Sequence, residues 1–496
     1  MIAEPAAPRA GHRGEIVALQ LVVGLFLALR LYYDLRADLF GDEAYYWMWG
    51  QRLGWSYFDH PPLHAWLLRP VSAIAGWHVF SVRLLTWVTL GGVLLIFRHW
   101  SRLLSPETPS LAFWRTTAIY LASPIFFGMT MIAYNDHLLV ALSLLAIHCF
   151  VVFSTRHATA APHATRWLYF AAVALGLALL TKYNAIFVGL GFAALFLFDR
   201  NLRPLLKTPH PWLAGLLAIA MQAPVVWWNL TEGLASFRYH LDDRWQGDAW
   251  QIHPMHPVNF LLLTFVVWSP FLIWPLVRMI RAPALSPFEG AAKRLVVTIF
   301  AISTISLVAI SLVLDAYYYW NIVAFVGLMP LLVRFLGNRW LRWSHIVFGL
   351  VAAGLIVTNF SITPIGNAIG RRDNGSSINY GWTEIADHMR AVEAKAPADL
   401  VAATRYSTTS QLGFALGTTE AVKISPEHSQ YDYWQDDTSY AGKSALILVD
   451  EADKSPVLNY LKAHFAGLKQ VDAFNIDRFG KTLYRWRIFL GEGYTP

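Results

Sequence analysis

The chain has 496 residues, of which 56% are apolar and 14% charged. An ordinary soluble domain carries roughly a quarter charged residues, so this composition excludes a simple soluble protein and indicates a membrane protein. The net charge of +7 would suit a nucleic-acid partner, but in a membrane protein the position of Lys and Arg matters more than their sum, and we expect no nucleic-acid binding. The single cysteine, Cys149, excludes a disulfide framework within the chain.

Long apolar runs predict a polytopic α-helical membrane protein. A helix needs roughly 17 to 25 apolar residues to cross the hydrocarbon core, and eleven runs approach that length. They cover residues 16–33, 78–97, 111–129, 136–153, 167–181, 183–198, 211–229, 258–277, 295–314, 319–336 and 344–362. The fifth and sixth runs are short and joined by TKYN, so a tight hairpin or a re-entrant pair is the alternative there.

The distribution of Lys and Arg predicts the orientation. The connections on one side of these spans carry 17 Lys and Arg, and those on the other side carry six: Arg36, Arg52, Arg69, Lys182, Arg238 and Arg244. The positive-inside rule therefore places the N-terminus in the cytoplasm. The first apolar run lacks a cleavage site for a signal peptidase, so we expect it to remain as a helix.

The loop over residues 34–77, which this orientation places outside, carries unusual polar residues next to the membrane. Asp42 and Glu43 follow the first span closely, and Asp59 and His60 come later, before Pro61 and Pro62. The plain interpretation of the first pair is a helix start, because Asp caps helices and Glu suits a first turn. The two prolines favour a fixed backbone around Asp59 and His60, as expected at a site.

Aromatic residues surround these acids. Trp and Tyr gather at membrane interfaces whatever the function, so an aromatic belt or an interfacial helix is at least as good an interpretation as sugar stacking. The set comprises Tyr45, Tyr46, Trp47, Trp49, Trp55, Tyr57 and Phe58. These residues predict a location rather than a chemistry.

Two further charged residues are expected on the same side. Asp136, in the short YNDH connection, either starts the fourth span or lines a cavity, since ionisable residues at membrane depth are usually functional. Lys182, between the fifth and sixth runs, either extends its ammonium to the interface or binds a phosphate.

Histidines and tyrosines occupy later outward connections. His253 and His256 are either loop histidines or partners of Asp59 in a divalent-metal site, with Mg, Mn or Zn as the ion. Arg238 and Tyr317 are further candidates for a phosphate contact, although Tyr317 also suits an interfacial anchor.

After residue 364 the pattern changes, which predicts a transmembrane domain over 1–364 and a small α/β domain over 365–496. GWTEIADHMRAVEAK and SPVLNYLKAHFAGL read as helices, and SALILVD and KTLYRWRIFL read as strands. Eleven crossings from a cytoplasmic start place this domain outside, on the same side as the loop over residues 34–77.

Acids, a lysine, histidines and aromatics at one membrane face suit a substrate that is half lipid and half polar. A polyprenyl-phosphate sugar fits, since a cation or metal can stabilise the leaving phosphate while a carboxylate takes a proton from the attacking hydroxyl. No Gly-rich phosphate loop is present, so we expect no nucleotide.

Taken together, these motifs resemble the bacterial integral-membrane glycosyltransferases of family 39. The resemblance lies in GDEAYYW, YFDHPPLHAWL, the NDH turn, GLALLTKYNAIF and WWNLTEGLASFRYH, with SPEHSQYDYW in the C-terminal domain. The class includes protein O-mannosyltransferases, lipid A aminoarabinose transferases and rhizobial lipopolysaccharide galacturonosyltransferases.

The resemblance implies a C-type glycosyltransferase fold in the inner membrane, a polyprenyl-phosphate sugar donor and a periplasmic acceptor, lipid A or lipopolysaccharide core. It implies that Asp42 is the base or acceptor-aligning group and that Glu43 and Asp136 belong to the same site. Where aminoarabinose transferases have a Glu-Lys pair, this chain has Asp59 and His60. The resemblance therefore does not imply aminoarabinose as the sugar.

The predicted roles divide accordingly. His60, Lys182, Arg83, Arg238 and Tyr317 are the candidates for binding the donor phosphate, and Asp59, His253 and His256 are the candidates for binding a metal. The alternatives are a protein O-mannosyltransferase, a flippase or transporter for a lipid-linked sugar, and a scaffold. A transporter should show inverted repeats and charges near mid-membrane, whereas the polar residues here gather at the outer ends.

Overall fold

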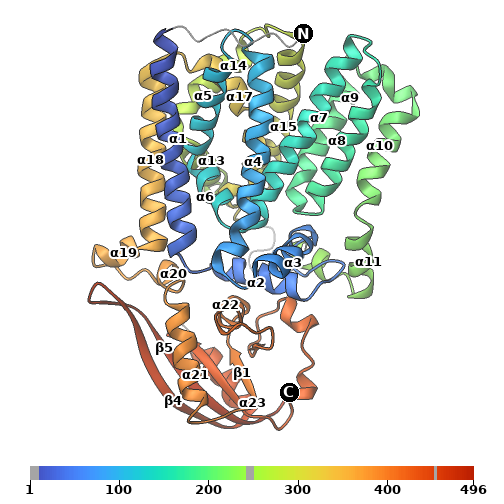
Figure 1. The fold of residues 1–496 in the computed structure, drawn as a ribbon. Helices are drawn as coiled ribbons and strands as arrows, with labels where there is room; N and C mark the ends of the chain where they lie inside the picture. Colours follow the sequence, from blue (N-terminus) through green and yellow to red (C-terminus); the bar gives the residue numbers. More distant parts are fainter. Residues whose placement is uncertain (1–9, 242–250, 452–454) are drawn as a thin grey trace. The chain divides into compact units, whose positions relative to one another are not determined.

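The computed structural model describes residues 10–241, 251–451 and 455–496. It divides into two compact units (Figure 1). The first unit comprises Met1–Arg30, His60–His64 and Leu84–Gly354, and the second comprises Leu31–Asp59, Ala65–Arg83 and Leu355–Pro496. Asp242, Asp243 and Arg244, which belong to one of the predicted outward connections, lie outside the described residues.

The first unit is a bundle of helices. Its members, three of which also contribute residues to the second unit, are α1 (Ala10–Arg36), α4 (Val79–Leu104), α5 (Pro109–Leu121), α6 (Pro124–Met131), α7 (Asn135–Ala158), α8 (Ala164–Leu179), α9 (Ile186–Phe198), α10 (Pro209–Ala220), α11 (Ala223–Thr231), α12 (Ala235–Leu241), α13 (Met255–Trp268), α14 (Ile273–Arg281), α15 (Pro287–Ser311), α16 (Ile322–Val326), α17 (Met329–Leu332) and α18 (Arg339–Ser361). Helices α7, α8, α9 and α10 pack side by side (Figure 1).

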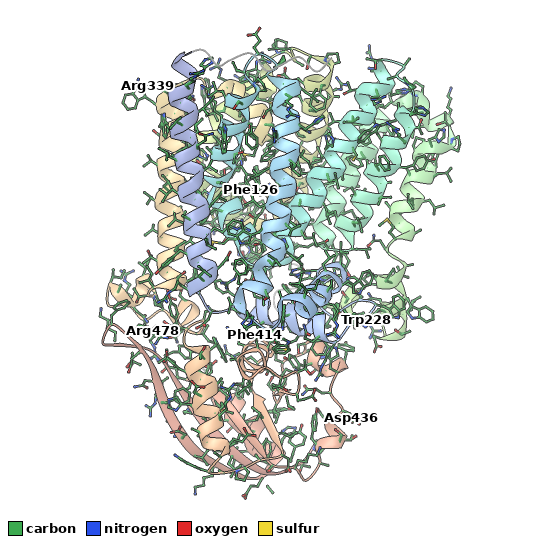
Figure 2. The ribbon with its side chains drawn as sticks, in the orientation of Figure 1. Phe126, Trp228, Arg339, Phe414, Asp436 and Arg478 are labelled. Atoms are coloured by element: carbon green, nitrogen blue, oxygen red, sulfur yellow. The ribbon has the colours of Figure 1, made fainter. Side chains whose placement is uncertain are left out.

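The helices of this bundle have the surface expected of membrane spans. Among the described residues, five helices are long and apolar enough to cross a membrane, or up to eight if each bent helix pair is one span. Large apolar side chains such as Leu21, Leu95 and Ile305 are about two-thirds exposed, as expected of positions that face lipid. Phe126, by contrast, lies inside the bundle (Figure 2).

All eleven predicted apolar runs are helical, but several of them are interrupted. The pairs α10–α11, α13–α14 and the helical segments over 318–335 bend by 43°, 85° and 65°. Pro224, Pro270 and Pro330 lie at these breaks, because proline lacks the N–H that the preceding turn would bind. The count of eleven crossings stays a prediction.

The second unit contains a five-stranded mixed sheet of order β2-β1-β3-β5-β4. The strands are β1 (Leu400–Ala403), β2 (Val422–Lys423), β3 (Ala445–Asp450), β4 (Phe465–Arg478) and β5 (Lys481–Tyr494). β1 pairs in parallel with β2 and β3, and β5 pairs antiparallel with β3 and β4. The six residues of β3 are all buried, as expected of a central strand covered on both faces.

Helices complete the second unit. They are α2 (Gly41–Gln51), α3 (Leu63–Ala75), whose first two residues belong to the first unit, and α19 (Ile365–Ala368), α20 (Asn374–Ser377), α21 (Trp382–Glu393), α22 (Tyr406–Leu416) and α23 (Ser455–His464). The predicted helix at 381–395 and the predicted strands at 444–450 and 481–490 are present. The helix predicted over 455–468 ends at His464, since Phe465 already begins β4.

Candidate functional site

Helix α2 carries the first two candidate acids. Asp42 and Glu43 lie in its first turn, where carboxylates interact favourably with the helix dipole. The Glu43 carboxylate also accepts a hydrogen bond at 3.0 Å from the backbone N–H of Phe40, which closes the N-terminus of the helix. Neighbouring helical residues point about 100° apart, so the two carboxylates have different surroundings.

Glu43 forms a buried, two-point ion pair with Arg83. The Arg83 Nε and Nη2 atoms donate to the two carboxylate oxygens at 2.9 and 2.7 Å, and both side chains are fully buried. The guanidinium also donates to the backbone carbonyls of Ala37 and Asp38 at 3.0 and 2.9 Å. Arg83 therefore anchors the turn before α2, and its role as a phosphate contact stays a prediction.

Asp42 accepts a hydrogen bond from the C-terminal part of the chain. The phenol of Tyr406, at the start of α22, donates to Asp42 Oδ1 at 3.0 Å. Burial, reinforced by the charge of Asp42, raises the pKa of Tyr406 far above its ordinary value, so this phenol stays protonated. Helices α2 and α22 pack closely: Phe414 of α22, labelled in Figure 2, has its ring centroid 5.9 Å from that of Trp47 of α2, and the two rings meet edge-on.

Asp59 has a similar partner. The phenol of Tyr45 donates to Asp59 Oδ2 at 2.8 Å and accepts a hydrogen bond from the backbone N–H of Gln430 at 2.7 Å. The Gln430 side chain in turn accepts from the backbone N–H of Phe58 at 2.7 Å. The C-terminal segment therefore fixes the position of Tyr45 and of the backbone next to Asp59.

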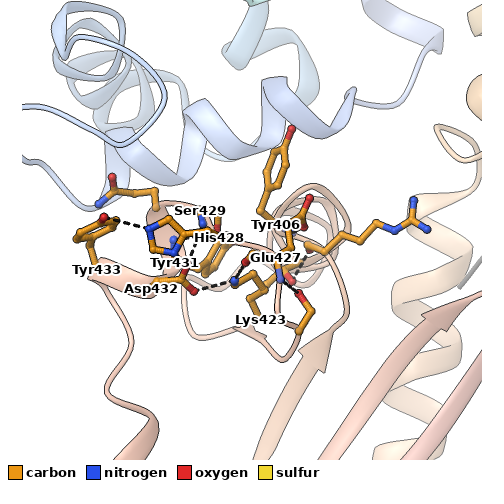
Figure 3. Close-up of polar contacts among 12 residues, drawn as sticks. Tyr406, Lys423, Glu427, His428, Ser429, Tyr431, Asp432 and Tyr433 are labelled. Carbon is orange, nitrogen blue, oxygen red and sulfur yellow. Dashed lines mark hydrogen bonds and ion pairs between the residues drawn. The ribbon is translucent and has the colours of Figure 1, made fainter. Parts of the chain in front are cut away.

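The loop that carries Gln430 is itself held by ion pairs (Figure 3). Lys423 contacts Asp432 at 2.7 Å, and the other carboxylate oxygen of Asp432 contacts His428 at 2.8 Å. Glu427 accepts the backbone N–H of Tyr406 at 3.1 Å, and burial raises the pKa of this carboxyl group. This loop is the SPEHSQYDYW segment, so its polar residues fold the loop that positions Gln430.

The aromatics around the first loop form a core rather than an interfacial belt. Six of the seven are buried, and Trp55 alone among the seven is exposed, at 62%. The buried six are Tyr45, Tyr46, Trp47, Trp49, Tyr57 and Phe58. Their interpretation as an exposed interfacial belt is wrong, because the side chains are buried and Tyr45 and Trp47 contact the C-terminal part of the chain. An interfacial position of helix α2 stays a prediction.

In the first unit, Asp136 and Lys182 form a second buried ion pair. The Lys182 ammonium lies 2.9 Å from both carboxylate oxygens and 5.1 Å from the ring centroid of Tyr319. Asp136 is in the first turn of α7 but does not cap it through its side chain. The aromatic partner of Lys182 is thus Tyr319, whereas Tyr317 is about half exposed and stacks on Tyr319 at 5.5 Å.

The first unit also contains two pairs of histidines whose rings lie close together. The buried rings of His64 and His137 approach to 3.4 Å between their Nε2 atoms, and His137 Nδ1 contacts Thr89 at 3.0 Å. Burial lowers the pKa of His64 to about 4, so this imidazole is neutral near pH 7. His60 lies 6.2 Å from the ring of His240, which in turn meets the Tyr183 ring edge-on at 5.2 Å.

The remaining residues predicted to bind a metal or the donor phosphate are His253, His256 and Arg238. His253 and His256 stack at 4.5 Å, and Arg238 is an exposed residue of α12. In the described parts of the chain, no three His, Cys, Asp or Glu side chains gather as metal ligands would. The predicted metal site at Asp59, His253 and His256 stays a prediction.

Comparisons with known proteins bear on this arrangement. Residues 59–228 match the family model of dolichyl-phosphate-mannose-protein mannosyltransferases. The lipid A galacturonosyltransferase RgtD of Rhizobium johnstonii is 25% identical over 426 residues, which cover 83% of each chain. The resemblance to the glycosyltransferases of family 39 is confirmed.

Solved structures show the same fold. ArnT from Cupriavidus metallidurans in the apo state superposes with a TM-score of 0.64 at 14% identity, covering 97% of this chain and 98% of ArnT. Its undecaprenyl phosphate complex gives 0.64 over 95% and 97%. The oligosaccharyltransferase AglB from Archaeoglobus fulgidus gives 0.50 at 12% identity, over 96% and 74%. The chain is thus a multi-pass membrane protein with the C-type glycosyltransferase fold.

Sequence analysis missed two residues of the second unit, Tyr406 and Gln430. The SPEHSQYDYW motif containing Gln430 was visible, but nothing in it indicates a bond to a residue near the N-terminus. Tyr406 lies in no motif, and its partner Asp42 is 364 positions away. A signal for such contacts would come from paired substitutions between related sequences.

Proposed function

We propose that this protein transfers a sugar from a polyprenyl-phosphate donor to lipid A or lipopolysaccharide core on the periplasmic side of the inner membrane. The observation that carries the proposal is the similarity over 83% of the chain to a lipid A galacturonosyltransferase. The fold of an undecaprenyl phosphate-bound transferase supports the donor. Galacturonic acid is the first sugar to test, because it is the sugar that RgtD is named for.

The proposed reaction is a single inverting displacement. The acceptor oxygen forms a bond to the anomeric carbon while the bond from that carbon to the phosphate oxygen breaks, and the polyprenyl phosphate leaves with the electron pair. When the acceptor is a hydroxyl, Asp42 takes its proton. When the acceptor is a phosphate, the nucleophile is already ionised and Asp42 only aligns it.

Lys182 and Asp136 would act on the donor side. A lysine that already lies against a carboxylate and an aromatic face is held in one position, so it can meet a phosphate without reorganising. His60 and Arg238 are further candidate contacts for the same phosphate. Glu43 and Arg83 would maintain the loop and α2 that carry Asp42.

The test is mass spectrometry of lipid A, core oligosaccharide and periplasmic proteins from a deletion strain. We expect lipid A or core to lose the mass of one sugar and to regain it when the wild-type gene is returned. An unchanged profile in all three fractions would contradict a transferase function.

A second candidate function is protein O-mannosyl transfer, which the matching family description favours. It predicts that the missing sugar mass belongs to periplasmic proteins, with lipid A and core unchanged. The same experiment therefore separates the two acceptors.

A further inference from the structure

The proposed function assigns no role to the C-terminal domain. Two hydrogen bonds from this domain to residues of the first loop indicate a role. Tyr406 of α22 donates to the candidate base Asp42 at 3.0 Å, and Gln430 donates its backbone N–H to Tyr45, the phenol that binds Asp59, at 2.7 Å. The rings of Tyr45 and Tyr406 lie 4.6 Å apart, so the two phenols form one packed pair between the two acids.

We propose that the C-terminal domain completes the acid site of the first loop, with Tyr406 as the positioning residue for Asp42. This inference rests on the proposed function. A phenol that donates to a carboxylate stabilises its ionised form and fixes its orientation, so Tyr406 would hold the Asp42 carboxylate in one orientation for the acceptor.

The surroundings of Tyr406 keep it a donor. Two further carboxylates, Asp59 and Glu427, raise its pKa beside the effects of burial and Asp42, and Arg405 lies close enough to act on Glu427. Tyr45 completes the surroundings as a buried, protonated phenol, since burial and then Asp59 raise its pKa. Only deprotonation at strongly alkaline pH would remove the bond to Asp42.

The chain offers a matched control. Tyr431, also buried in the C-terminal domain, has its hydroxyl 2.9 Å from Ser410 Oγ and stacks on Tyr45 at 6.1 Å. Y431F therefore makes the same chemical change near the same pair without removing a bond to an acid.

The experiment compares Y406F with Y431F in reconstituted protein. For Y406F we expect a kcat at least about tenfold lower, a donor KM within about twofold of the wild type, and an acid limb of the pH–rate profile moved to higher pH, because Asp42 loses a donor to its charged form. Y431F should keep the wild-type acid limb. A Y406F enzyme with wild-type kcat and pH profile, in a system where D42N is inactive, would overturn the inference.

A second readout does not depend on transfer. Carbodiimides modify protonated carboxyl groups, so labelling of Asp42 at pH 6, read by peptide mass spectrometry, should rise in Y406F and not in Y431F. Equal labelling of Asp42 in both variants would count against Tyr406, whereas a wild-type protein that transfers no sugar would count against the proposed function alone.

An independent observation concerns a pocket in the first unit. It has a volume of about 500 Å³, within the range of ligand sites, and lies between α4 and α5. Its walls include Arg98 and Arg102, one turn apart on α4, together with Leu94, Leu95 and Phe113. The pocket wall therefore has two positively charged side chains next to an apolar surface.

These two arginines differ from the arginines of the bundle that are paired with acids. Four arginines of the first unit contact carboxylates: Arg115 and Arg342 contact Glu15, Arg294 contacts Asp199, and Arg334 contacts Glu289, all at 2.7 to 2.9 Å. Within the described ranges, neither Arg98 nor Arg102 has an ion pair or a side-chain hydrogen bond. Both lie in the last two turns of α4, a helix long and apolar enough to cross a membrane, and the end of such a helix is where lipid head groups are expected.

We infer that this pocket binds an anionic glycerophospholipid, with its phosphate between Arg98 and Arg102 and an acyl chain along Leu94, Leu95 and Phe113. A lipid satisfies both the charge and the apolar wall, whereas free phosphate satisfies only the charge. The matched control is Arg339, an exposed residue at the start of α18 that stacks on Trp340 at 5.2 Å (Figure 2).

The experiment purifies R98Q/R102Q, R339Q and the wild type from vesicles of phosphatidylglycerol and phosphatidylcholine and counts retained lipids by native mass spectrometry. We expect the double variant to lose at least one phosphatidylglycerol that R339Q and the wild type retain. Equal retention in all three proteins would overturn the inference. A thermal shift with inorganic phosphate as large as that with phosphatidylglycerol would also overturn it, because the apolar wall would then have no role.

Discussion

At the scale of single residues, each of the four candidate carboxylates has a side-chain partner. Glu43 binds Arg83, Asp42 binds Tyr406, Asp59 binds Tyr45 and Asp136 binds Lys182. These acids could be predicted as site residues from the sequence, because an acidic residue next to an apolar span is unusual. Of these partners, Lys182 and Arg83 were also picked out, as phosphate contacts, but their pairing with particular acids depends on the tertiary fold.

Variants of the Asp136–Lys182 ion pair can show whether the pair serves stability alone or also sugar transfer. Removing one member of a buried ion pair leaves an unpaired charge and costs about 3–5 kcal/mol, whereas removing both charges costs less. We expect D136N and K182Q to be unstable and the double variant to regain thermal stability. If Lys182 binds the donor phosphate, the double variant should still transfer sugar about 100-fold more slowly than the wild type. Restored transfer in the double variant would mean that the pair is only structural.

His64 predicts a pH dependence of stability. Its pKa is about 4 in the folded protein, below the ordinary value of 6.5. The unfolded chain therefore binds a proton that the folded chain does not, so this contribution to stability is complete above about pH 6.5 and is lost as the pH falls toward 4. We expect the melting temperature of the reconstituted protein to fall less between pH 7.5 and 5 in H64Q than in the wild type. Parallel pH curves would contradict this assignment.

At the scale of elements, the apolar runs and the amphipathic helix α21 follow from the sequence pattern. The positions at which helices break follow less well from the sequence, because a proline within an apolar run can begin, bend or end a helix. Strand β4 shows another limit: its first residues continue an apparent helix, and only pairing with β5 along 14 residues makes them a strand. Tertiary pairing overrides local propensity there.

Packing between helices predicts the effect of two glycine substitutions in α18. A Cβ at Gly349 would overlap the backbone carbonyl of Ala122, at the end of α5, while a Cβ at Gly354 would meet nothing within 4 Å. We expect G349A to reduce the yield of folded protein severalfold, because backbone cannot move aside as a side chain can. G354A should express and elute like the wild type on size exclusion. Equal yields would show that α5 and α18 do not approach so closely.

At the scale of the whole molecule, the likeness to ArnT over 97% of this chain extends through the C-terminal domain. Sequence reasoning separated this domain from the membrane part at residue 364, and that boundary stays a prediction. The compact unit that contains it also includes residues 31–59 and 65–83, which cover most of the first loop. The association could not be predicted, because contacts across more than 360 positions leave no periodic or local signal.

The central claim is tested most directly by sugar transfer in proteoliposomes. Purified wild-type protein and D42N are given a polyprenyl-phosphate galacturonic acid donor and lipid A, and the product is weighed by mass spectrometry. We predict that the wild type adds one sugar to lipid A and releases polyprenyl phosphate, and that D42N, folded by the same melting curve, forms at most about one-hundredth as much product. Full transfer by D42N would contradict the account.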